Sequence, residues 1–298
     1  MNSEDFKRRL ELRGRTDHLD YFEQLAPADE PVPTDKKQLY HLENVAAQLL
    51  IASWQPLANQ FYSLIFFLLR EPEAYATIIE EIRAAFQDIK AIKTESVGPL
   101  KYLNACIQES LRLHPETTDG LPRISPGASV AGRYISQGVS LAFHIPSEAA
   151  EYTERSSALR FKQVTCQVSY FAATRSPRYF TDPLSFRPER WLSPDHPRFN
   201  PRYQDDDLKA SKPFSQGPRG CSGGAVALNV IRLFIAKVLW QFDLEAAPGQ
   251  KGLSFDNDFK FGTFWERPQF WVHFKSRERS ETEVCVEEAQ ERLRAPFE

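Results

Sequence analysis

The chain has 298 residues, of which 42% are hydrophobic and 26% are charged, and its formal net charge is −3. This length is enough for one large domain or two ordinary ones, and the composition is typical of a soluble globular protein. The slight negative charge argues against nucleic acid as a partner. The cysteines are scattered without paired spacing, which indicates neither a disulfide framework nor a zinc site; they are Cys106, Cys166, Cys221 and Cys285.

No signal peptide or membrane-spanning helix is predicted. Residues 1–15 are strongly charged, and the most apolar stretch, residues 63–69, is too short to cross a bilayer. We therefore expect no membrane anchor in this chain, and the sequence leaves its localisation unknown.

Residues 1–33 are polar and are interpreted as a lead-in to the folded part of the chain. Thr34 or Asp35 can cap the helix that follows. Gln38 is placed for a capping box behind Asp35.

The apolar positions of this helix run over residues 39–69 and are broken at Pro56. Proline lacks a backbone N–H and should kink the helix. A second amphipathic pattern covers residues 72–86. A third helix follows with one apolar face, and it carries Glu109 and Arg112 one turn apart, where their side chains can pair. By spacing alone, this is equally an ordinary solvated ion pair.

The later part of the chain mixes extended and helical patterns. Residues 129–135 predict a strand, and residues 139–163 show neither helical nor strand periodicity. A helix with one buried stripe is predicted over residues 227–239. Residues 261–274 are aromatic and extended, which favours a terminal hairpin. Residues 276–298 are rich in glutamate and arginine and are interpreted as a charged tail, either helical or disordered.

The sequence around Cys221 carries the most specific chemical signal, and it reads FSQGPRGCSG over residues 214–223. A thiolate placed directly before a helix is stabilised by free backbone N–H groups and the helix dipole. Both lower the pKa of a thiol and favour metal ligation. The glycines let the backbone approach a large flat ligand, and Arg219 offers a cation to an anionic group on it. These features predict a cysteine-ligated haem; the alternative is a glycine-rich turn around a buried cysteine.

This segment resembles the haem-binding loop of the cytochrome P450 superfamily, the haem-thiolate monooxygenases. The family loop has the pattern F-x-x-G-x-R-x-C-x-G, and every fixed position is met: Phe214, Gly217, Arg219, Cys221 and Gly223. The resemblance implies that these residues bind haem b and that Cys221 is the ligand of its iron.

Two further motifs support the resemblance. Glu109 and Arg112 match the family's E-x-x-R helix, and the sequence FRPERW over residues 186–191 matches a downstream motif. In the family the arginine of that motif joins the pair, so Arg190 is expected to complete a buried structural triad. Losing one member would cost roughly 3–5 kcal/mol, because a buried charge would be left uncompensated. Arg123 aligns with a position that contacts a haem propionate; the alternative is a solvated arginine in a proline-flanked loop.

The resemblance implies a mainly α fold with a minor β-sheet, corresponding to the C-terminal portion of the cytochrome P450 fold, over residues 34–275. It also implies electrons from NADPH-cytochrome P450 reductase, received at the face around Arg219, and oxidation of a small apolar substrate. The motifs are most similar to those of fungal members of secondary metabolism. Full-length relatives are anchored to the endoplasmic reticulum membrane.

Two differences from the family bear on activity. The family helices that roof the substrate cavity, including one with a W-x-x-x-R contact to haem, have no counterpart, which predicts an N-terminally truncated chain. On the central helix the family's acid–alcohol pair is replaced by Gln55 and Pro56, neither of which can deliver a proton. The chain is therefore a monooxygenase that takes its proton from water or substrate, an enzyme that rearranges a peroxide, a haem-binding module without turnover, or an inactive remnant.

The third difference is an insertion. In the family, Gly138 would connect almost directly to Val164, whereas residues 139–163 intervene here. We interpret them as a translated, unspliced intron, because Val139-Ser140 can be encoded by a donor-like sequence and Gln163 by an acceptor-like CAG. The alternative is a genuine surface loop, which long insertions can form at little cost in free energy.

Overall fold

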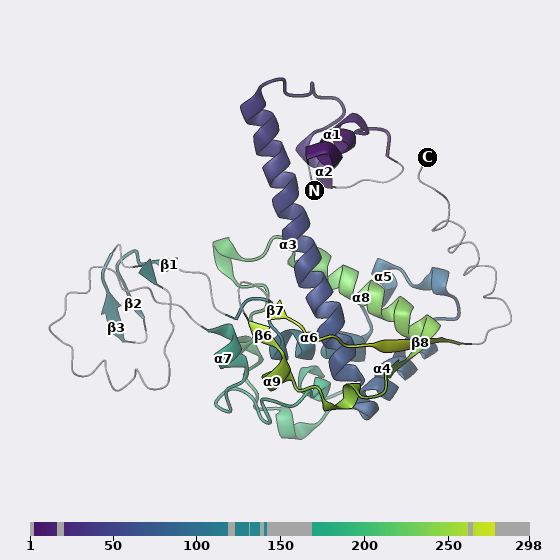
Figure 1. Ribbon diagram of the computed structural model, residues 1–298. Helices are drawn as coiled ribbons and strands as arrows, with labels where there is room; N and C mark the ends of the chain where they lie inside the picture. The colour runs from purple at the N-terminus through teal and green to yellow at the C-terminus, as the bar shows by residue number, and fades with distance from the viewer. Residues whose placement is uncertain are drawn as a thin grey trace. The chain divides into compact units, whose positions relative to one another are not determined.

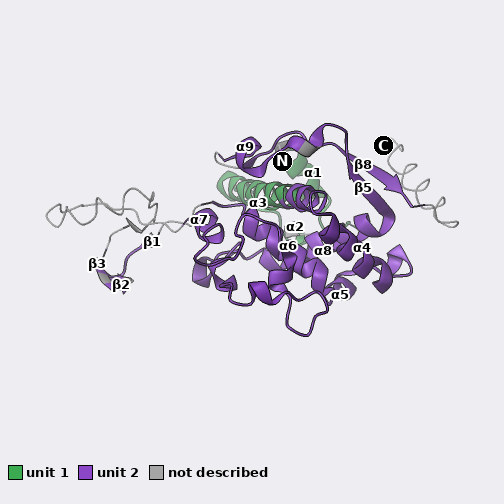
Figure 2. Cartoon of the chain, turned by 90° about the horizontal axis from the view of Figure 1, so that it is seen from below, with its two compact units in different colours: residues 1–59 green, residues 60–298 purple. Residues whose placement is uncertain are grey.

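The structure is a computed structural model that describes residues 3–16, 21–118, 123–130, 132–137, 140–141, 169–261 and 265–277. Over these ranges the chain is mainly helical and has four two-stranded antiparallel sheets (Figure 1). This is the fold class expected from the sequence. The chain divides into two compact units, residues 1–59 and residues 60–298 (Figure 2), and each is described by itself.

Unit 1 contains α1 (Ser3–Glu11), α2 (Tyr21–Leu25) and the first part of α3 (Lys36–Leu68). Its small core consists of Phe6, Phe22, Ala26 and Ala46. The rings of Phe6 and Phe22 pack edge to face with centroids 5.7 Å apart. The segment expected only as a polar lead-in therefore forms two helices, because a few widely spaced apolar residues suffice to hold them together.

The start of α3 follows the predicted cap, since the backbone N–H of Gln38 donates to Asp35 Oδ2 at 3.1 Å. Pro56 lies inside α3, and the helix continues through this residue although the apolar pattern is interrupted there. The kink expected at Pro56 stays a prediction. A proline inside a helix removes one hydrogen bond, and its ring crowds the carbonyl four residues earlier. The part of α3 in unit 2 is fixed by burial of Leu64, Phe66 and Leu68, which offsets that loss.

Unit 2 is built around α4 (Pro72–Ala85), α6 (Lys101–Leu113) and α8 (Gly224–Gln241), which pack against one another. The short α5 (Thr94–Val97) and the 3-10 turn η1 (Ile89–Ala91) also contact α8. Most side chains of α6 are buried, so it is the central helix of this unit.

The first turn of α6 receives its cap from another helix. Glu81 on α4 accepts the backbone N–H of Tyr102 through Oε1 and that of Leu103 through Oε2, both at 2.8 Å. A carboxylate at this end of a helix satisfies N–H groups that have no partner within the helix and complements the helix dipole. The contact fixes α4 and α6 to each other.

The helix α8 is long and apolar enough to cross a membrane by length and composition, with a mean hydropathy of 1.4. It is the sole such helix in the part of the chain that the structure describes. One stripe of α8 is buried in unit 2, including Ile231, Ile235 and Leu239. The indole of Trp240 donates to the carbonyl of Phe86 at 3.0 Å. Only 28% of this apolar segment is buried, so α8 packs on unit 2 along one stripe.

Each of the sheets pairs two short strands. β5 (Phe242–Ala246) follows α8 and pairs with β8 (Val272–Ser276), with Leu244 opposite Phe274. The hairpin of β6 (Lys260–Phe261) and β7 (Trp265–Glu266) lies between them in sequence. The terminal hairpin predicted for residues 261–274 is therefore only partly right, because β8 pairs with β5 instead of with its nearest neighbour.

The strand predicted for residues 129–135 is two strands. β2 (Ala128–Val130) pairs with β3 (Arg133–Ile135), and Gly132 between them has a φ of 78°. A positive φ is available to glycine at little cost and allows the tight reversal. β1 (Arg123–Ile124) pairs with β4 (Ser140–Leu141), so the start of the expected insertion takes part in a strand pair.

The remaining elements are short turns that lie between the main helices or after α8. They are α7 (Tyr170–Thr174), η2 (Pro188–Trp191), η3 (Pro201–Tyr203), η4 (Leu208–Ala210), η5 (Gly217–Arg219), η6 (Gln250–Gly252) and α9 (Phe255–Asp258). Of these, η2 packs on α6 and η5 lies in the loop that carries Cys221.

Candidate functional site

The loop of residues 214–223 presents its cysteine to the outside of unit 2. Cys221 is exposed, and its backbone N–H donates to the carbonyl of Phe214 at 2.8 Å. Within the loop, the N–H of Gly220 donates to the carbonyl of Gly217 at 2.9 Å. The structure contradicts the alternative of a buried cysteine in a glycine-rich turn, because the thiol of Cys221 is accessible.

Each glycine in and next to this loop has a different structural environment. Gly217 has a φ of 70°, and a Cβ there would meet nothing within 4 Å, so its surface side is open. A Cβ on Gly223 would lie 3.9 Å from the sulfur of Cys221. A Cβ on Gly224 would come within 3.2 Å of the Phe214 ring, which therefore packs on the first turn of α8.

These observations fit a thiolate ligand to haem. One accessible sulfur lies just before an 18-residue helix, and glycine backbone with open space lies beside it. A flat macrocycle needs an accessible ligand and neighbours without side chains in its way. Arg219 is also exposed in the same loop.

Glu109, Arg112 and Arg190 are in direct contact, and their side chains are 0% exposed. Arg112 donates to both oxygens of Glu109, from Nε at 2.7 Å and from Nη2 at 2.8 Å. Arg190 donates from Nε to Glu109 Oε1 at 3.0 Å. The structure thus brings together all three residues of the expected triad, one pair from α6 and one arginine from η2.

Each N–H of the Arg112 guanidinium has an acceptor. Besides Glu109, it donates to the carbonyls of Thr174 at 2.6 Å, Pro183 at 2.7 Å and Ser185 at 3.1 Å. Arg112 therefore fixes the chain after α7 onto α6, and a lysine could not replace this planar set of donors.

The carboxylate of Glu109 stays charged despite its burial. Burial alone would raise its pKa, but the guanidinium of Arg112 and its hydrogen bonds, together with Arg190 and the N–H of Arg187, hold the pKa below its ordinary value. A carboxyl whose pKa is lowered on folding stabilises the native state above its unfolded pKa, and this contribution is lost as pH falls through the native pKa.

Sequence reasoning missed three partners of this triad. The indole N–H of Trp191 donates to Glu109 Oε2 at 2.9 Å, and the backbone N–H of Arg187 donates to Oε1 at 2.9 Å. Both lie in the FRPERW motif, so their proximity could have been found from it. The third partner, Asp206, forms an ion pair with Arg190, and no motif distinguishes it from the aspartates on either side.

The structure does not describe how three other predicted site residues lie relative to this loop. Gln55 and Pro56 are half-buried on α3 in unit 1, whereas Cys221 belongs to unit 2. The backbone of Arg123 forms part of β1, but its side chain lies outside the described part of the structure. The roles expected for these residues stay predictions.

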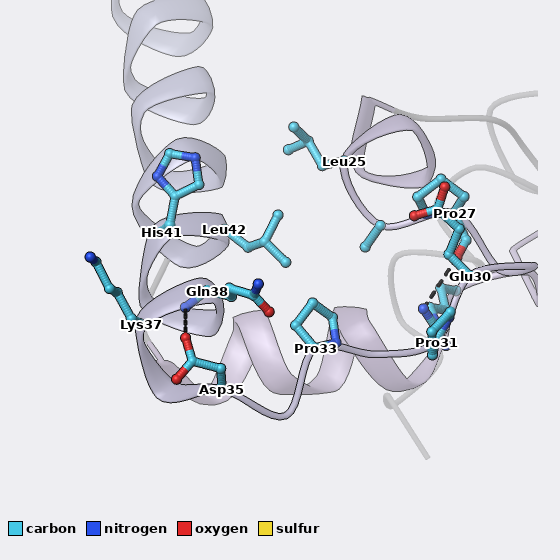
Figure 3. Close-up of a pocket in the computed structure, with 12 residues that line it drawn as sticks. Leu25, Pro27, Glu30, Pro31, Pro33, Asp35, Lys37, Gln38, His41 and Leu42 are labelled. Atoms are coloured by element: carbon cyan, nitrogen blue, oxygen red, sulfur yellow. Dashed lines mark hydrogen bonds between the residues drawn. The ribbon is translucent and has the colours of Figure 1, made fainter.

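A cavity of about 600 Å³ lies in unit 1, and its lining is drawn in Figure 3. The wall includes Leu25 from α2 and Leu42 from α3, with Pro31 and Pro33 from the connection between them. Its charged groups have both signs, with Arg13 and Lys37 against Glu30 and Asp35. The lining contains none of the residues predicted to bind haem.

Comparison with known proteins identifies the family. The model of the family described as Cytochrome P450 matches residues 3–148 and 161–271. The chain is 40% identical over 271 residues to cytochrome P450 monooxygenase TwmD of Talaromyces wortmannii, covering 91% of this chain and 48% of that protein. It is 37% identical over 235 residues to cytochrome P450 monooxygenase ABA2 of Pyricularia oryzae, covering 76% and 50%. It is 35% identical over 231 residues to cytochrome P450 monooxygenase BOA3 of Botryotinia fuckeliana, covering 78% and 40%.

The chain belongs to the cytochrome P450 family, whose members hold haem through a cysteine thiolate. It spans about half the length of the curated relatives it matches. The relatives named here are fungal proteins and are called monooxygenases.

Proposed function

We infer that this chain binds haem b through the thiolate of Cys221 and contributes to oxidation of a small apolar substrate in fungal secondary metabolism. The observation that carries this proposal is the exposed sulfur of Cys221 directly before α8, in a loop that meets every fixed position of the family pattern. Membership of the family and the names of the fungal relatives support it.

The residues of the loop have distinct roles in this proposal. Cys221 supplies the single protein ligand to the iron, and Gly217 and Gly223 leave room for the macrocycle. Phe214 packs on Gly224 and holds the loop against the start of α8. When bound, a thiolate-ligated haem supplies the chemistry that inserts one oxygen atom into an apolar substrate.

The triad holds the chain that leads into this loop. Glu109 and Arg112 are fixed on α6, and Arg190 connects them to η2, which packs on the same helix. We assign these residues a structural role, because their side chains are buried and have no access to a substrate. Arg219 is exposed beside Cys221 and is the cation that we assign to the haem and to the face that receives the reductase.

A second candidate function is haem binding without turnover, and Gln55 and Pro56 favour it. The neutral amide of Gln55 cannot deliver a proton, and Pro56 has neither a hydroxyl nor an N–H. A chain with these residues would keep haem and lose the usual proton delivery, unless water or the substrate supplies the proton. Rearrangement of a peroxide would need no such delivery.

We also propose that residues 34–275 form the part of the family domain present here and that residues 139–163 are an insertion or retained intron. The insertion is supported by the family match, which leaves residues 149–160 unmatched within that range. The match itself begins at residue 3, so it extends further towards the N-terminus than the proposed domain. Sequencing the mature transcript decides between the two origins. A message that still encodes residues 139–163 refutes the intron.

The experiment that tests the function is haem reconstitution of the full chain. We expect the chain expressed with a haem precursor, reduced and exposed to carbon monoxide, to show the Soret band of thiolate ligation. That band with conversion of an apolar substrate in the presence of NADPH-cytochrome P450 reductase supports the enzyme. The band without conversion supports the binding module, and a chain that retains no haem contradicts both.

A further inference from the structure

The buried triad is not electrically balanced by itself. Arg112 and Arg190 each carry a positive charge and Glu109 carries one negative charge, and all three side chains are 0% exposed. An excess buried charge is strongly unfavourable, because the interior does not solvate it as water does. The structure therefore requires a further anion close to these residues.

Asp206 is that anion. It forms an ion pair with Arg190 on the side of the guanidinium that Glu109 does not occupy, through Nη1, and its own side chain is only 2% exposed. Two arginines then face two carboxylates within one buried group, and the net charge is zero.

Asp206 is also fixed by a second contact. Its Oδ1 accepts the backbone N–H of Thr181 at 2.7 Å, and the carbonyl of Thr181 accepts from Arg190 Nη2 at 3.0 Å. The Arg190 guanidinium lies over the ring of Tyr203 at 4.7 Å. These contacts connect Asp206 to Arg190 both directly and through the backbone of Thr181.

The ion pair between Asp206 and Arg190 also restrains the loop of residues 214–223, because Asp206 lies shortly before this loop in the chain. Asp206 begins the segment that leads through η4 into Phe214 and Cys221. The next residue continues the attachment, since the N–H of Asp207 donates to the carbonyl of Tyr179 at 2.8 Å. At the other end, the N–H of Cys221 is held by the carbonyl of Phe214.

We propose that Asp206 is a positioning residue: it is the fourth charged member of the Glu109–Arg112–Arg190 group and fixes the start of the segment that carries Cys221. It acts through Arg190 and not by contact with haem or substrate. The proposal concerns the folded chain without haem, so it does not depend on the proposed function.

The test compares Asp206→Asn with the matched control Asp205→Asn, which changes the adjacent exposed aspartate in the same way. Hydrogen exchange of the full chain without haem is followed by mass spectrometry. In Asp206→Asn we expect amides of residues 206–224 to exchange faster, on the order of tenfold, while the buried amides of α4 keep the parent rate. Asp205→Asn should match the parent throughout.

A double variant separates charge balance from position. Arg190→Gln combined with Asp206→Asn removes one charge of each sign and leaves the neutral pair of Glu109 and Arg112. We expect a higher urea midpoint than for Asp206→Asn alone, with the fast exchange of residues 206–224 retained because the connection to Arg190 is lost. If Asp206→Asn does not fold, folding of the double variant supports the proposal and its failure to fold contradicts it.

Three results would overturn the proposal. They are exchange in Asp206→Asn equal to that of Asp205→Asn, faster exchange spread equally over α4 and residues 206–224, and a double variant less stable than Asp206→Asn.

A parent chain that retains no haem would contradict the proposed function and leave these readouts intact. With haem bound, Asp206→Asn should also show a smaller fraction of the thiolate-type carbon monoxide band than Asp205→Asn.

Discussion

Arg112 and Glu109, three residues apart on α6, are joined by two parallel hydrogen bonds of 2.7 and 2.8 Å and are fully buried. A guanidinium and a carboxylate in this geometry satisfy each other's charge and direction, which an exposed pair cannot do as well. The pair fixes the Arg112 guanidinium in place, and its remaining N–H groups then hold the chain after α7 against α6.

Replacing Glu109 with glutamine should lower the free energy of unfolding by about 3–5 kcal/mol, because two buried arginines lose their shared carboxylate. The measurement is the urea midpoint at neutral pH. The control is Asp195→Asn, which removes the exposed partner of Lys101 and should leave the midpoint unchanged. Equal midpoints for the two variants would contradict the buried network.

Glu81→Ala should lower the free energy of unfolding by about 1–2 kcal/mol, since the N–H groups of Tyr102 and Leu103 lose their acceptor. The control is Glu80→Ala, which truncates the exposed neighbour on α4. Hydrogen exchange at the first turn of α6 reports the same loss locally. Unchanged exchange at Tyr102 and Leu103 would show that Glu81 is not the cap.

The stability of the protein should decrease from pH 6.5 downward because of His114. Its ring is buried against Trp265, at a centroid distance of 4.6 Å, and against Phe255, at 5.2 Å. Burial, reinforced by the charges of Arg175 and Arg267, lowers the pKa of His114 from 6.5 to about 3.

The unfolded chain therefore binds one more proton than the native chain between these two pH values. Each pH unit of acidification in that window should cost about 1.4 kcal/mol of stability. The measurement is the urea midpoint at pH 7, 6, 5 and 4, compared between the parent and His114→Leu. We expect the stability of the variant to fall less steeply with acidification than that of the parent, by the contribution of one proton. Equal pH dependence of stability in the two proteins would contradict a buried neutral imidazole at His114.

How far the sequence predicts this structure differs from residue to residue. The helix of Glu109 and the helix after Cys221 were predictable, because each has an apolar stripe at helical spacing that the fold buries. Pairing of β8 with β5 was not, because pairing between strands distant in sequence depends on the fold. Asp206 stands between two other aspartates, and only the tertiary structure decides which one is buried.

The candidate site likewise has features that the sequence predicted and features that it did not. The loop pattern predicted an accessible Cys221 because the chemistry of a metal ligand needs one, and the structure shows it exposed. The pattern at Gln55 and Pro56 predicted an altered proton supply and a kinked helix. Both stay predictions, since the structure shows only that one helix runs through Pro56.

If the chain retains haem, restoring an acid and an alcohol should restore proton delivery. Gln55→Glu combined with Pro56→Thr should raise the rate of substrate oxidation by roughly 10²-fold, the usual contribution of a positioned proton donor. The measurement is product formation per haem, with Gln55→Leu combined with Pro56→Ala as the control that lacks both groups. Equal rates in the two double variants would show that this position does not supply the proton.

The central claim is that the sulfur of Cys221 ligates haem iron, and the most direct measurement is the carbon monoxide spectrum of the reduced, haem-loaded chain beside those of two cysteine variants. Cys221→Ser should lose the thiolate-type Soret band while keeping the parent's urea midpoint, because the residue is exposed. Cys106→Ser, which alters a buried cysteine, should keep the band and lower the midpoint. A thiolate-type band that survives in Cys221→Ser would contradict the account.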